Sequence, residues 1–505
     1  MTVTKELWII VIIYLILNII VGNLVGRKEK NSGGIQSYYH SSLPASIVAL
    51  ACTGTAISGV AFIGTPGTTY MQGIGVWSMN AVGGILGIIL CTWLVGKPLM
   101  AMNRRLNTIT LTDLLVDIFD DKRLRFICIP CLLVVSTVYT AVQWQSIGTI
   151  LNTLLGMDYT LAVILGVVVV ALYSILGGNK STAVVGAVQI MIAMIACVYL
   201  VFAALKVNGG GLGKLINDVN LVKPELLQMT NSNLSFGAMM SYLIMYGIGY
   251  IGQPAIAVRY FQLQNPKMLP KTMFFGVVSM FITTLVPIVA LTMTVQVAHG
   301  NIAELVTPDS CTPSFIALFC GPYAGGLLVS ACLAAIMSTG ASLLISASST
   351  LVKDMMGDWL HVDMSGKKGD IYSRLGTVAV IIASTLIACF PSGGILQIGF
   401  AAWGAFGAIF APTMIMGLRW RRSTKQGAFW GMISGAAVVL IFTLLNLTGI
   451  YPWPLDWHIS VIAIVVHFIV LIVVSLLTPT QDKNFMPPTR KELKAMLAEK
   501  SRNIV

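Results

Sequence analysis

The chain has 505 residues, of which 56% are hydrophobic and 10% are charged, whereas a soluble domain carries about a quarter charged residues. This composition excludes an ordinary soluble protein and makes the lipid bilayer the expected partner of most of the surface. The formal net charge of +12 does not indicate nucleic-acid binding, because the basic residues lie in loops between apolar stretches.

Apolar stretches of about 20 residues, each long enough to cross a bilayer as a helix, recur along the whole chain. The first is not followed by a small-residue cleavage site, so we interpret it as a membrane span and not as a signal peptide. We expect an all-α integral membrane protein with about thirteen transmembrane helices in residues 1–480 and a cytoplasmic tail in residues 481–505. The predicted spans lie at 7–25, 44–66, 74–96, 126–152, 159–177, 183–205, 235–255, 272–296, 317–350, 373–391, 395–418, 427–447 and 458–477.

Lys and Arg are concentrated in alternate loops, for example at Arg104 and Arg105, at Lys367 and Lys368, and at Arg421. The positive-inside rule assigns such loops to the cytoplasm. We therefore predict a multi-pass protein of the inner or plasma membrane of the cell, with its amino terminus outside and its carboxyl terminus in the cytoplasm.

The second and seventh predicted spans are interrupted by glycine and proline. They read VALACTGTAISGVAFIGTPGTTY and MMSYLIMYGIGYIGQPAIAVRY, and they run in opposite directions in the predicted topology. Paired broken helices are typical of inverted-repeat transporters, which bind their substrates at the midplane of the membrane. The alternative is that the small residues only allow close helix packing, but the pairing favours transport.

The ninth predicted span contains the hydroxyl-rich stretch AAIMSTGAS, from Ala334 to Ser342. Hydroxyls of an intact helix can complete an all-oxygen cation cage with carbonyls that a broken helix leaves free. The alternative is that each hydroxyl only bonds to the i−4 carbonyl of its own helix. The crowding of hydroxyls on one span, with broken helices available, favours the cage.

Several segments resemble, in the same order, the signature segments of the sodium:solute symporters, and the chain looks most like the pantothenate and proline permease branches. The resemblance implies a five-plus-five inverted repeat of the leucine-transporter type over about 44–418, with one extra helix before it and two after. The segments are AFIGTPGTTYMQGIGVW, RRLNTITLTDLL, YSILGG, IGQPAIAVRYF, AAIMSTGASLLISASSTLVKD and GAIFAPTMIMGLRWRRSTKQGAFWGMISG.

The resemblance implies one sodium site, built from carbonyls of the first core helix and from a carbonyl and two hydroxyls of the eighth. Carried onto this sequence, the ligands are Gly54, Ile57, Ala335, Ser338 and Thr339.

The chain departs from the family pattern at acidic positions. A second sodium site found in some members uses an Asp where this chain has Gly186 and a Ser where it has Ala341, so we expect that site to be absent. The proline branch also carries an Asp at the position of Ala56. We expect no buried charge in the core and no proton coupling through a buried carboxylate.

We expect the substrate to be a small carboxylate, because the amino ends of the half-helices present free N–H groups and a positive partial charge. Hydroxyl, amide and aromatic side chains would surround it, although Tyr and Trp are also ordinary packing and interface residues in membranes. The candidates are Thr53, Thr55, Ser58, Tyr139, Gln143, Trp144, Tyr246, Tyr250, Gln253, Trp403 and Phe406.

The sequence thus predicts a sodium-coupled symporter that imports a small organic solute by alternating access, with Na⁺ as the coupling ion. Pantothenate or a monocarboxylate is the first candidate solute, and an amino acid such as proline is the alternative. A sensor without transport or a passive channel of the same fold is a further alternative. No motif supplies a nucleophile, a base or a metal cluster, so we expect no enzymatic activity, and we expect the protein to function as a monomer.

Overall fold

The structure is a computed structural model of the chain, and it describes residues 5–27, 35–39, 43–100, 109–261, 263, 266–391, 393–448 and 456–479. Regular structure in these residues is helical, which confirms the predicted all-α class. The predicted tail, 481–505, lies outside the described residues.

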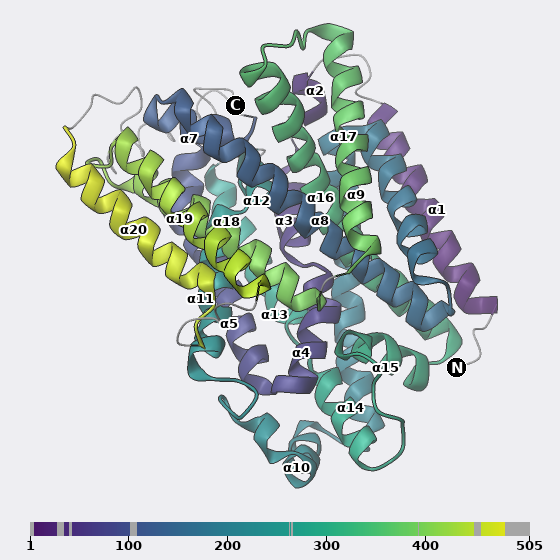
Figure 1. Ribbon diagram of the computed structural model, residues 1–505. Coiled ribbons are helices and arrows are strands. Elements are labelled where there is room, and N and C mark those ends of the chain that lie inside the picture. Colours follow the sequence, from purple (N-terminus) through teal and green to yellow (C-terminus); the bar gives the residue numbers. More distant parts are fainter. Residues whose placement is uncertain are drawn as a thin grey trace.

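Long helices cross the molecule from one end to the other, and short helices connect them at the two ends (Figure 1). The short ones are α2 (Ile35–Tyr39), α7 (Leu111–Phe119), α10 (Leu212–Val222) and α15 (Cys311–Phe319). The others are α1 (Lys5–Arg27), α3 (Ala45–Ala56), η1 (Val60–Gly64), α4 (Thr65–Gln72), α5 (Ile74–Leu90), η2 (Cys91–Gly96), α8 (Arg125–Leu155), α9 (Tyr159–Val207), α11 (Phe236–Gly252), α12 (Pro254–Phe261), α13 (Leu269–Thr283), α14 (Ile288–Ala298), α16 (Pro322–Ser349), η7 (Thr350–Trp359), α17 (Gly366–Cys389), α18 (Ile395–Arg419), α19 (Lys425–Leu447) and α20 (Ile459–Leu477).

Ten helical stretches of the described residues are long and apolar enough to span a membrane, and an eleventh span is the bent pair formed by α3 and η1–α4. The prediction of thirteen differs because it divides α9 in two and counts α11 with α12 as one further span. A straight helix of the 49 residues of α9 would be about 74 Å long, more than twice the apolar thickness of a bilayer. Gly178 breaks it with a left-handed φ of 57°, a conformation that glycine adopts without strain.

Helix α16 lies at the centre of the molecule and packs against α1, α3, α8, α9 and α17. Every residue in its most apolar stretch is buried, compared with 28% of that stretch in α1 and 22% in α19. Helix α1 therefore lies at one edge, and α19 and α20 pair at the opposite edge (Figure 1).

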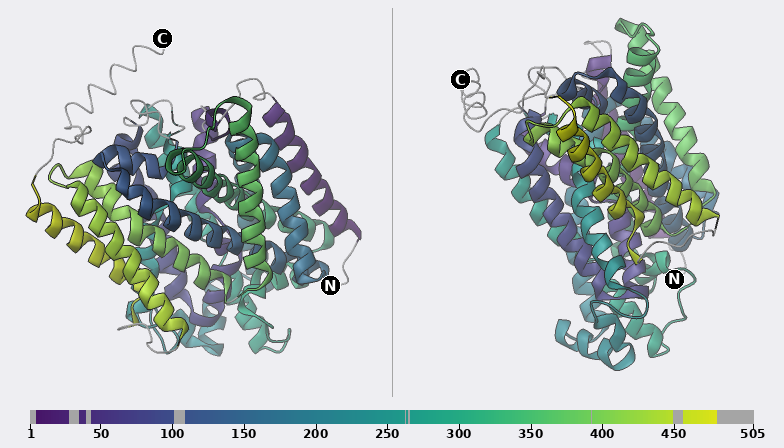
Figure 2. Two further views of the ribbon diagram at one scale, coloured as in Figure 1. Left: turned by 45° about the horizontal axis from the view of Figure 1, so that its top comes forward. Right: turned by 60° about the vertical axis from the view of Figure 1, so that its left-hand side comes forward.

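The two ends of the molecule carry different connecting helices. Helix α1 begins at the end that holds α10 and α15, and α20 ends at the opposite end, near α7 (Figures 1 and 2). We name these the outer end and the inner end, after the predicted orientation. With an odd number of spans, the start of the first span and the end of the last span lie on opposite sides of the membrane, as they do here. The assignment of the inner end to the cytoplasm stays a prediction.

Helices α11 and α18 approach each other unusually closely. A β-carbon at Gly249 would lie 2.6 Å from the Trp403 carbonyl oxygen, and one at Gly252 would lie 2.1 Å from the Phe406 carbonyl oxygen. Any larger residue at these positions would push the two backbones apart, because real carbon atoms do not approach oxygen so closely.

Candidate functional site

The two spans predicted to be broken are broken in the structure. Helix α3 ends at Ala56, and Ile57 after it is extended, with φ −90° and ψ 107°; the chain bends by 52° before it continues into η1 and α4. Helix α11 ends at Gly252, and Gln253 is extended, with φ −75° and ψ 120°. Both breaks interrupt the i→i−4 ladder and leave backbone groups free to bind other partners.

The five residues predicted to hold sodium converge at the break of α3. The Ser338 hydroxyl donates to the carbonyl oxygen of Gly54, 2.9 Å away. The Thr339 hydroxyl lies 3.0 Å from the same Gly54 oxygen and 2.8 Å from the carbonyl oxygen of Ile57. The Ala335 carbonyl oxygen lies 2.8 Å from the Ser338 hydroxyl. We name these residues the five-oxygen cluster.

The five-oxygen cluster is buried and contains only neutral oxygens. Ser338 is 2% exposed and Thr339 is fully buried. Two carbonyls of a broken helix, with one carbonyl and two hydroxyls of an intact helix, are the hard ligands that a hard cation prefers. The Ser338 hydroxyl has one proton and lies within bonding distance of both the Gly54 carbonyl and the i−3 carbonyl of its own helix, Ala335, so this stretch combines back-bonding with contact to the broken helix.

Helix α9 faces the cluster with a glycine. A β-carbon at Gly186 would lie 3.6 Å from the Cβ atom of Ser338 and meet no other atom within 4 Å, and the Gly186 carbonyl oxygen lies 3.3 Å from a β-carbon placed at Gly54. The position at which the resemblance implies an Asp in some members of the family therefore adjoins the five-oxygen cluster, and Gly186 contributes no charge there.

Polar candidates from α8 and α16 hold the backbone around the break of α3. The Gln143 amide oxygen accepts from the Gly59 N–H at 3.0 Å, and the Tyr139 hydroxyl donates to the Ser58 hydroxyl at 3.3 Å. The Thr55 hydroxyl lies 3.2 Å from that of Ser342 on α16. A buried amide requires such partners, and Gln143 is fully buried.

Aromatic candidates surround Trp403 on the outer side of the break. The ring centroids of Tyr246, Tyr250 and Tyr139 lie 4.8, 5.9 and 6.1 Å from that of Trp403. These spacings are typical of attractive aromatic pairs. The sequence analysis named all four residues as candidates for one substrate site, and their rings are neighbours in the structure.

An outer cavity ends at this aromatic group. Its volume is about 660 Å³, and Tyr242 and Phe400 line it. The Phe400 ring lies 5.6 Å from that of Tyr246 and 5.1 Å from that of Tyr242, so Phe400 separates the cavity from the rings around Trp403. The sequence analysis missed Tyr242 and Phe400, although each lies one helical turn or less from a residue that it named.

Four candidates lie apart from this group. The Trp144 indole donates to the Ser384 hydroxyl of α17 at 2.9 Å, and Thr53 lies towards α13, with its hydroxyl 3.8 Å from a β-carbon placed at Gly276. Phe406 is fully buried on α18, one turn below Trp403. Gln253 is fully buried at the second break, and both polar atoms of its amide lack a hydrogen-bond partner among the described residues.

The expectation that the core holds no buried charge is wrong. Arg259 of α12 is only 2% exposed, and its guanidinium donates to the Ser342 hydroxyl of α16 at 2.8 Å. Arg259 follows the apolar run of the seventh predicted span, which ends at residue 255, so its position in the sequence indicates a cation of the next loop. A guanidinium tolerates such burial when its donors find oxygen partners.

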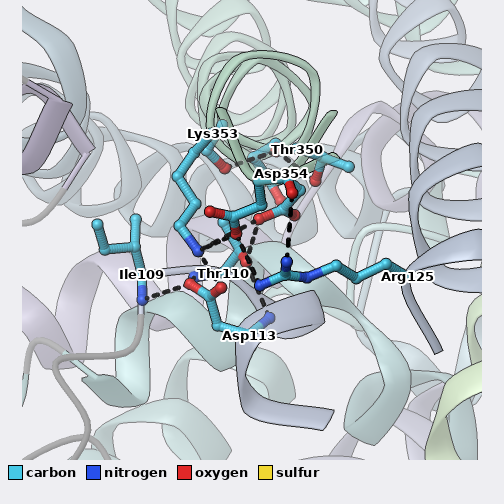
Figure 3. A network of polar contacts seen from close by, with 10 residues as sticks. Ile109, Thr110, Asp113, Arg125, Thr350, Lys353 and Asp354 are labelled. Carbon is cyan, nitrogen blue, oxygen red and sulfur yellow. Dashed lines mark hydrogen bonds and ion pairs between the residues drawn. The ribbon is translucent and has the colours of Figure 1, made fainter. Parts of the chain in front are cut away.

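A charged network at the inner end was also missed. Lys353 of η7 contacts the carboxylate of Asp113 on α7 and lies 2.8 Å from that of Asp358, and Arg125 at the start of α8 lies 3.0 Å from Asp358. The Thr110 hydroxyl donates to Asp354, 2.8 Å away. Figure 3 shows the side chains of Asp113, Arg125, Lys353 and Asp354 pointing toward one another and joining α7, α8 and η7. Most of the network lies in the segments RRLNTITLTDLL and STLVKD. The charged residues of these two segments were the sequence signal from which the network could have been predicted.

A comparison with family models matches residues 40–435 to the sodium:solute symporter family. The chain belongs to this family. The symporter is 31% identical over 447 residues to sodium/proline symporters of Staphylococcus aureus strains JH9 and COL, and the match covers 86% of each chain.

Two solved structures share the fold of the symporter. A sodium-coupled sialic acid symporter, solved in a substrate-bound outward-open state, matches with a TM-score of 0.77 and 16% identity over 95% of this chain and 99% of that chain. MHP1, a nucleobase-cation-symport-1 transporter solved closed with bromovinylhydantoin, matches with a TM-score of 0.56 and 14% identity over 93% and 99%. These matches confirm the predicted leucine-transporter type of fold.

The family assignment makes the symporter a sodium-coupled transporter of a solute, as predicted, and makes Na⁺ the coupling ion of the family. The comparisons do not support the expectation of pantothenate specificity. The relatives' name agrees with the alternative that the sequence analysis kept open, an amino acid such as proline.

Proposed function

We propose that the symporter binds one sodium ion at the five-oxygen cluster and imports it together with a small zwitterionic amino acid, with proline as the first candidate. The observation that carries the proposal is the approach of the Ser338 and Thr339 hydroxyls to the Gly54 and Ile57 carbonyls within 3.0 Å, across the gap between an intact and a broken helix. A sodium ion at this point ties α16 to the break of α3 and stabilises the arrangement that binds solute.

The residues beside the cluster suit an amino acid. The positive partial charge at the amino ends of the half-helices favours a carboxylate, and the amide of Gln253, which lacks a partner among the described residues, offers two donors and an acceptor. The faces of Tyr246, Tyr250 and Trp403 offer an apolar wall for a ring and a favourable surface for an ammonium group. A monocarboxylate would use the same N–H groups without the ammonium and is the second candidate.

Uptake into proteoliposomes tests the proposal. The protein is reconstituted with an inward sodium gradient and supplied with labelled proline, pantothenate, pyruvate, acetate or sialic acid. We expect saturable accumulation of proline that disappears when potassium replaces sodium. Accumulation of pantothenate or pyruvate instead would overturn the amino-acid proposal, and uptake that never exceeds the external concentration would favour a passive channel.

Membrane potential distinguishes the two solute classes. One sodium with a zwitterion moves one charge, worth about 2.3 kcal/mol per 100 mV, whereas one sodium with a monoanion moves none. We expect an inside-negative potassium-diffusion potential to increase accumulation strongly. An unchanged level at the same sodium gradient would contradict the zwitterion or the single sodium ion.

The proposal includes a monomer in the cell membrane, with the amino terminus outside and the carboxyl terminus in the cytoplasm. Cationic residues at the inner end, such as Lys353, Lys367 and Arg374, support this orientation through the positive-inside rule. Labelling of single cysteines introduced at Asn301 and at Lys367 in intact cells tests it. We expect a membrane-impermeant reagent to label only position 301.

A further inference from the structure

Arg259 joins the second broken span to the two helices that flank the sodium cluster. It lies on α12, directly after the break at Gln253. Its guanidinium donates to the Asn179 side-chain oxygen of α9 at 3.0 Å and to the Ser342 hydroxyl of α16 at 2.8 Å. The planar fork of arginine suits two acceptors on different helices. Arg259 therefore holds α9, α12 and α16 in one relative position.

Ser342 connects Arg259 directly to the cluster. Its hydroxyl donates to the Ser338 carbonyl oxygen at 3.0 Å, and its oxygen accepts from Arg259 at 2.8 Å. The Thr55 hydroxyl, which donates to the Ala51 carbonyl oxygen at 2.8 Å, lies 3.2 Å from that of Ser342. A hydroxyl has one donor and two acceptor lone pairs, so the bonds to Ser338 and Arg259 use the proton of Ser342 and one of its two lone pairs. While Arg259 stays in place, its guanidinium takes one of the lone pairs that Ser342 could offer to a cation and puts a positive charge beside the other.

A small polar cavity lies on the inner side of this contact. Its volume is about 10 Å³, close to the room that one water molecule needs, and its lining includes Tyr39, Asn179, Arg259, Ser342, Ser346 and Ser349. Helix α16 runs from the cluster past Ser342 to Ser346 and Ser349 toward the inner end. A cation that leaves the cluster along these hydroxyls meets Ser342 and the guanidinium first.

We propose that Arg259 is a charged gate on the inner side of the sodium site. While the guanidinium is bonded to Ser342, it excludes a second cation from the exit by like-charge repulsion, and it occupies the hydroxyl that the departing ion needs. When α12 moves and Arg259 leaves Ser342, the freed hydroxyl becomes a ligand on the inward path. The gate rests on the proposed sodium site at the five-oxygen cluster, and it adds the group that keeps sodium from leaking without solute.

Sodium flux without solute tests the gate. Full-length protein is reconstituted, and efflux of labelled sodium is measured with and without solute, together with solute accumulation. In the wild-type protein we expect sodium efflux to require solute. Arg259→Gln keeps amide donors but removes the charge; we expect at least a fivefold rise in solute-independent efflux and a lower accumulation ratio. Arg259→Lys keeps the charge, and we expect efflux within twofold of wild type.

Two further variants separate a gate from a structural role. Ser342→Ala leaves the charge in place but removes its anchor, and we expect a leak of the same sign, smaller than that of Arg259→Gln. Lys271→Gln removes an exposed cation of α13 and serves as the control with wild-type efflux. Equal leaks in the Gln and Lys variants, or tight coupling in both Arg259→Gln and Ser342→Ala, would overturn the gate.

The same experiment keeps the two proposals apart. Wild-type protein without any sodium-dependent solute uptake would overturn the proposed function, and the gate with it. Normal wild-type coupling, with every variant equally coupled, would overturn the gate alone. If Arg259→Gln yields no folded protein by size-exclusion chromatography, the comparison of Ser342→Ala with wild type decides the outcome.

Discussion

The Thr339 hydroxyl lies 2.8 Å from the Ile57 carbonyl oxygen, so an intact helix contacts the first residue beyond the end of a broken one. Ile57 is extended, and its carbonyl oxygen has no partner in a helical ladder. Thr339 and Ser338 together are the side chains through which α16 contacts the carbonyl oxygens at the break of α3.

The hydroxyls of the cluster should set the affinity for sodium. We expect Ser338→Ala and Thr339→Ala each to raise the sodium concentration for half-maximal uptake at least tenfold, since loss of one ligand oxygen costs about 1.4 kcal/mol. Sodium titration of uptake measures this. Ser330→Ala is the control, because the Ser330 hydroxyl bonds, within the described part of the chain, to Gly326 of its own helix at 2.8 Å. Unchanged sodium dependence in both variants would show that these hydroxyls only back-bond.

A carboxylate at Gly186 should strengthen sodium binding. The nearest atom to a β-carbon there is 3.6 Å away, which is an ordinary contact, so Gly186→Ala should fold and transport like wild type. We expect Gly186→Asp to lower the half-saturating sodium concentration several-fold, because the added negative charge lies beside a neutral cluster. Sodium titration of both variants measures the difference, and identical titrations would place the aspartate away from the ion.

A negative charge at Gln143 should repel a carboxylate solute. A Glu at this position still accepts from the Gly59 N–H, so the bond that holds the break is kept. We expect Gln143→Glu to raise the half-saturating solute concentration at least tenfold, without weakening sodium. Gln145→Glu adds the same charge two residues later on α8, on a different side of the helix. Gln145 is also buried, at 3% exposed, so this variant controls for the cost of burying a charge. Equal solute affinities in the two variants would argue against binding at Gln143.

The inner network should depend on Lys353 for stability. Lys353→Met leaves the carboxylates of Asp113, Asp354 and Asp358 without their shared cation, and we expect a loss of about 3 kcal/mol in unfolding free energy. Chemical denaturation in detergent measures it. Lys368→Met is the control, because Lys368 and Asp363 form a pair 3.4 Å apart whose side chains are 67% and 60% exposed, and exposed pairs contribute little. A similar loss in both variants would contradict the prediction.

The pH dependence of stability should contain a contribution from Asp117 on α7. Burial, followed by the nearby charge of Asp113, raises the pKa of the Asp117 carboxyl from 3.8 to about 6. The folded state therefore holds a proton that the unfolded chain releases, so Asp117 lowers stability as the pH rises through this interval.

Asp117→Asn should remove that loss. We expect the variant to gain stability relative to wild type as the pH rises from about 4 to about 6, and to keep the gain above it. Thermal unfolding across this range measures the difference. Parallel curves for the two proteins would show that Asp117 ionises normally.

The breaks of α3 and α11 could be predicted from the sequence because glycine and proline act locally, on the ladder of their own helix. The convergence of Ser338 and Thr339 on Gly54 could not: it joins residues about 280 positions apart, and the family resemblance supplied it.

Other features of the site escaped prediction for physical reasons. Consecutive residues of a helix point about 100° apart, so Trp144 faces Ser384 while Gln143 faces Gly59. Arg259 has the chemistry of a loop residue, and only its partners on α9 and α16 make its burial tolerable. A short stretch of sequence predicts neither the direction in which each side of a helix faces nor the partners that a residue finds on a distant helix.

The glycines of α11 have a mechanical consequence. Gly249 and Gly252 lie directly against the backbone of α18, and the helices could not separate at these positions without losing that close contact, so we expect α11 and α18 to move together. Tyr246 of α11 and Trp403 of α18 would then keep their relative position during such a movement. If the two helices move together, we expect a movement that opens the outer cavity to bend the chain at the extended residue Gln253, which would displace α12 and with it Arg259.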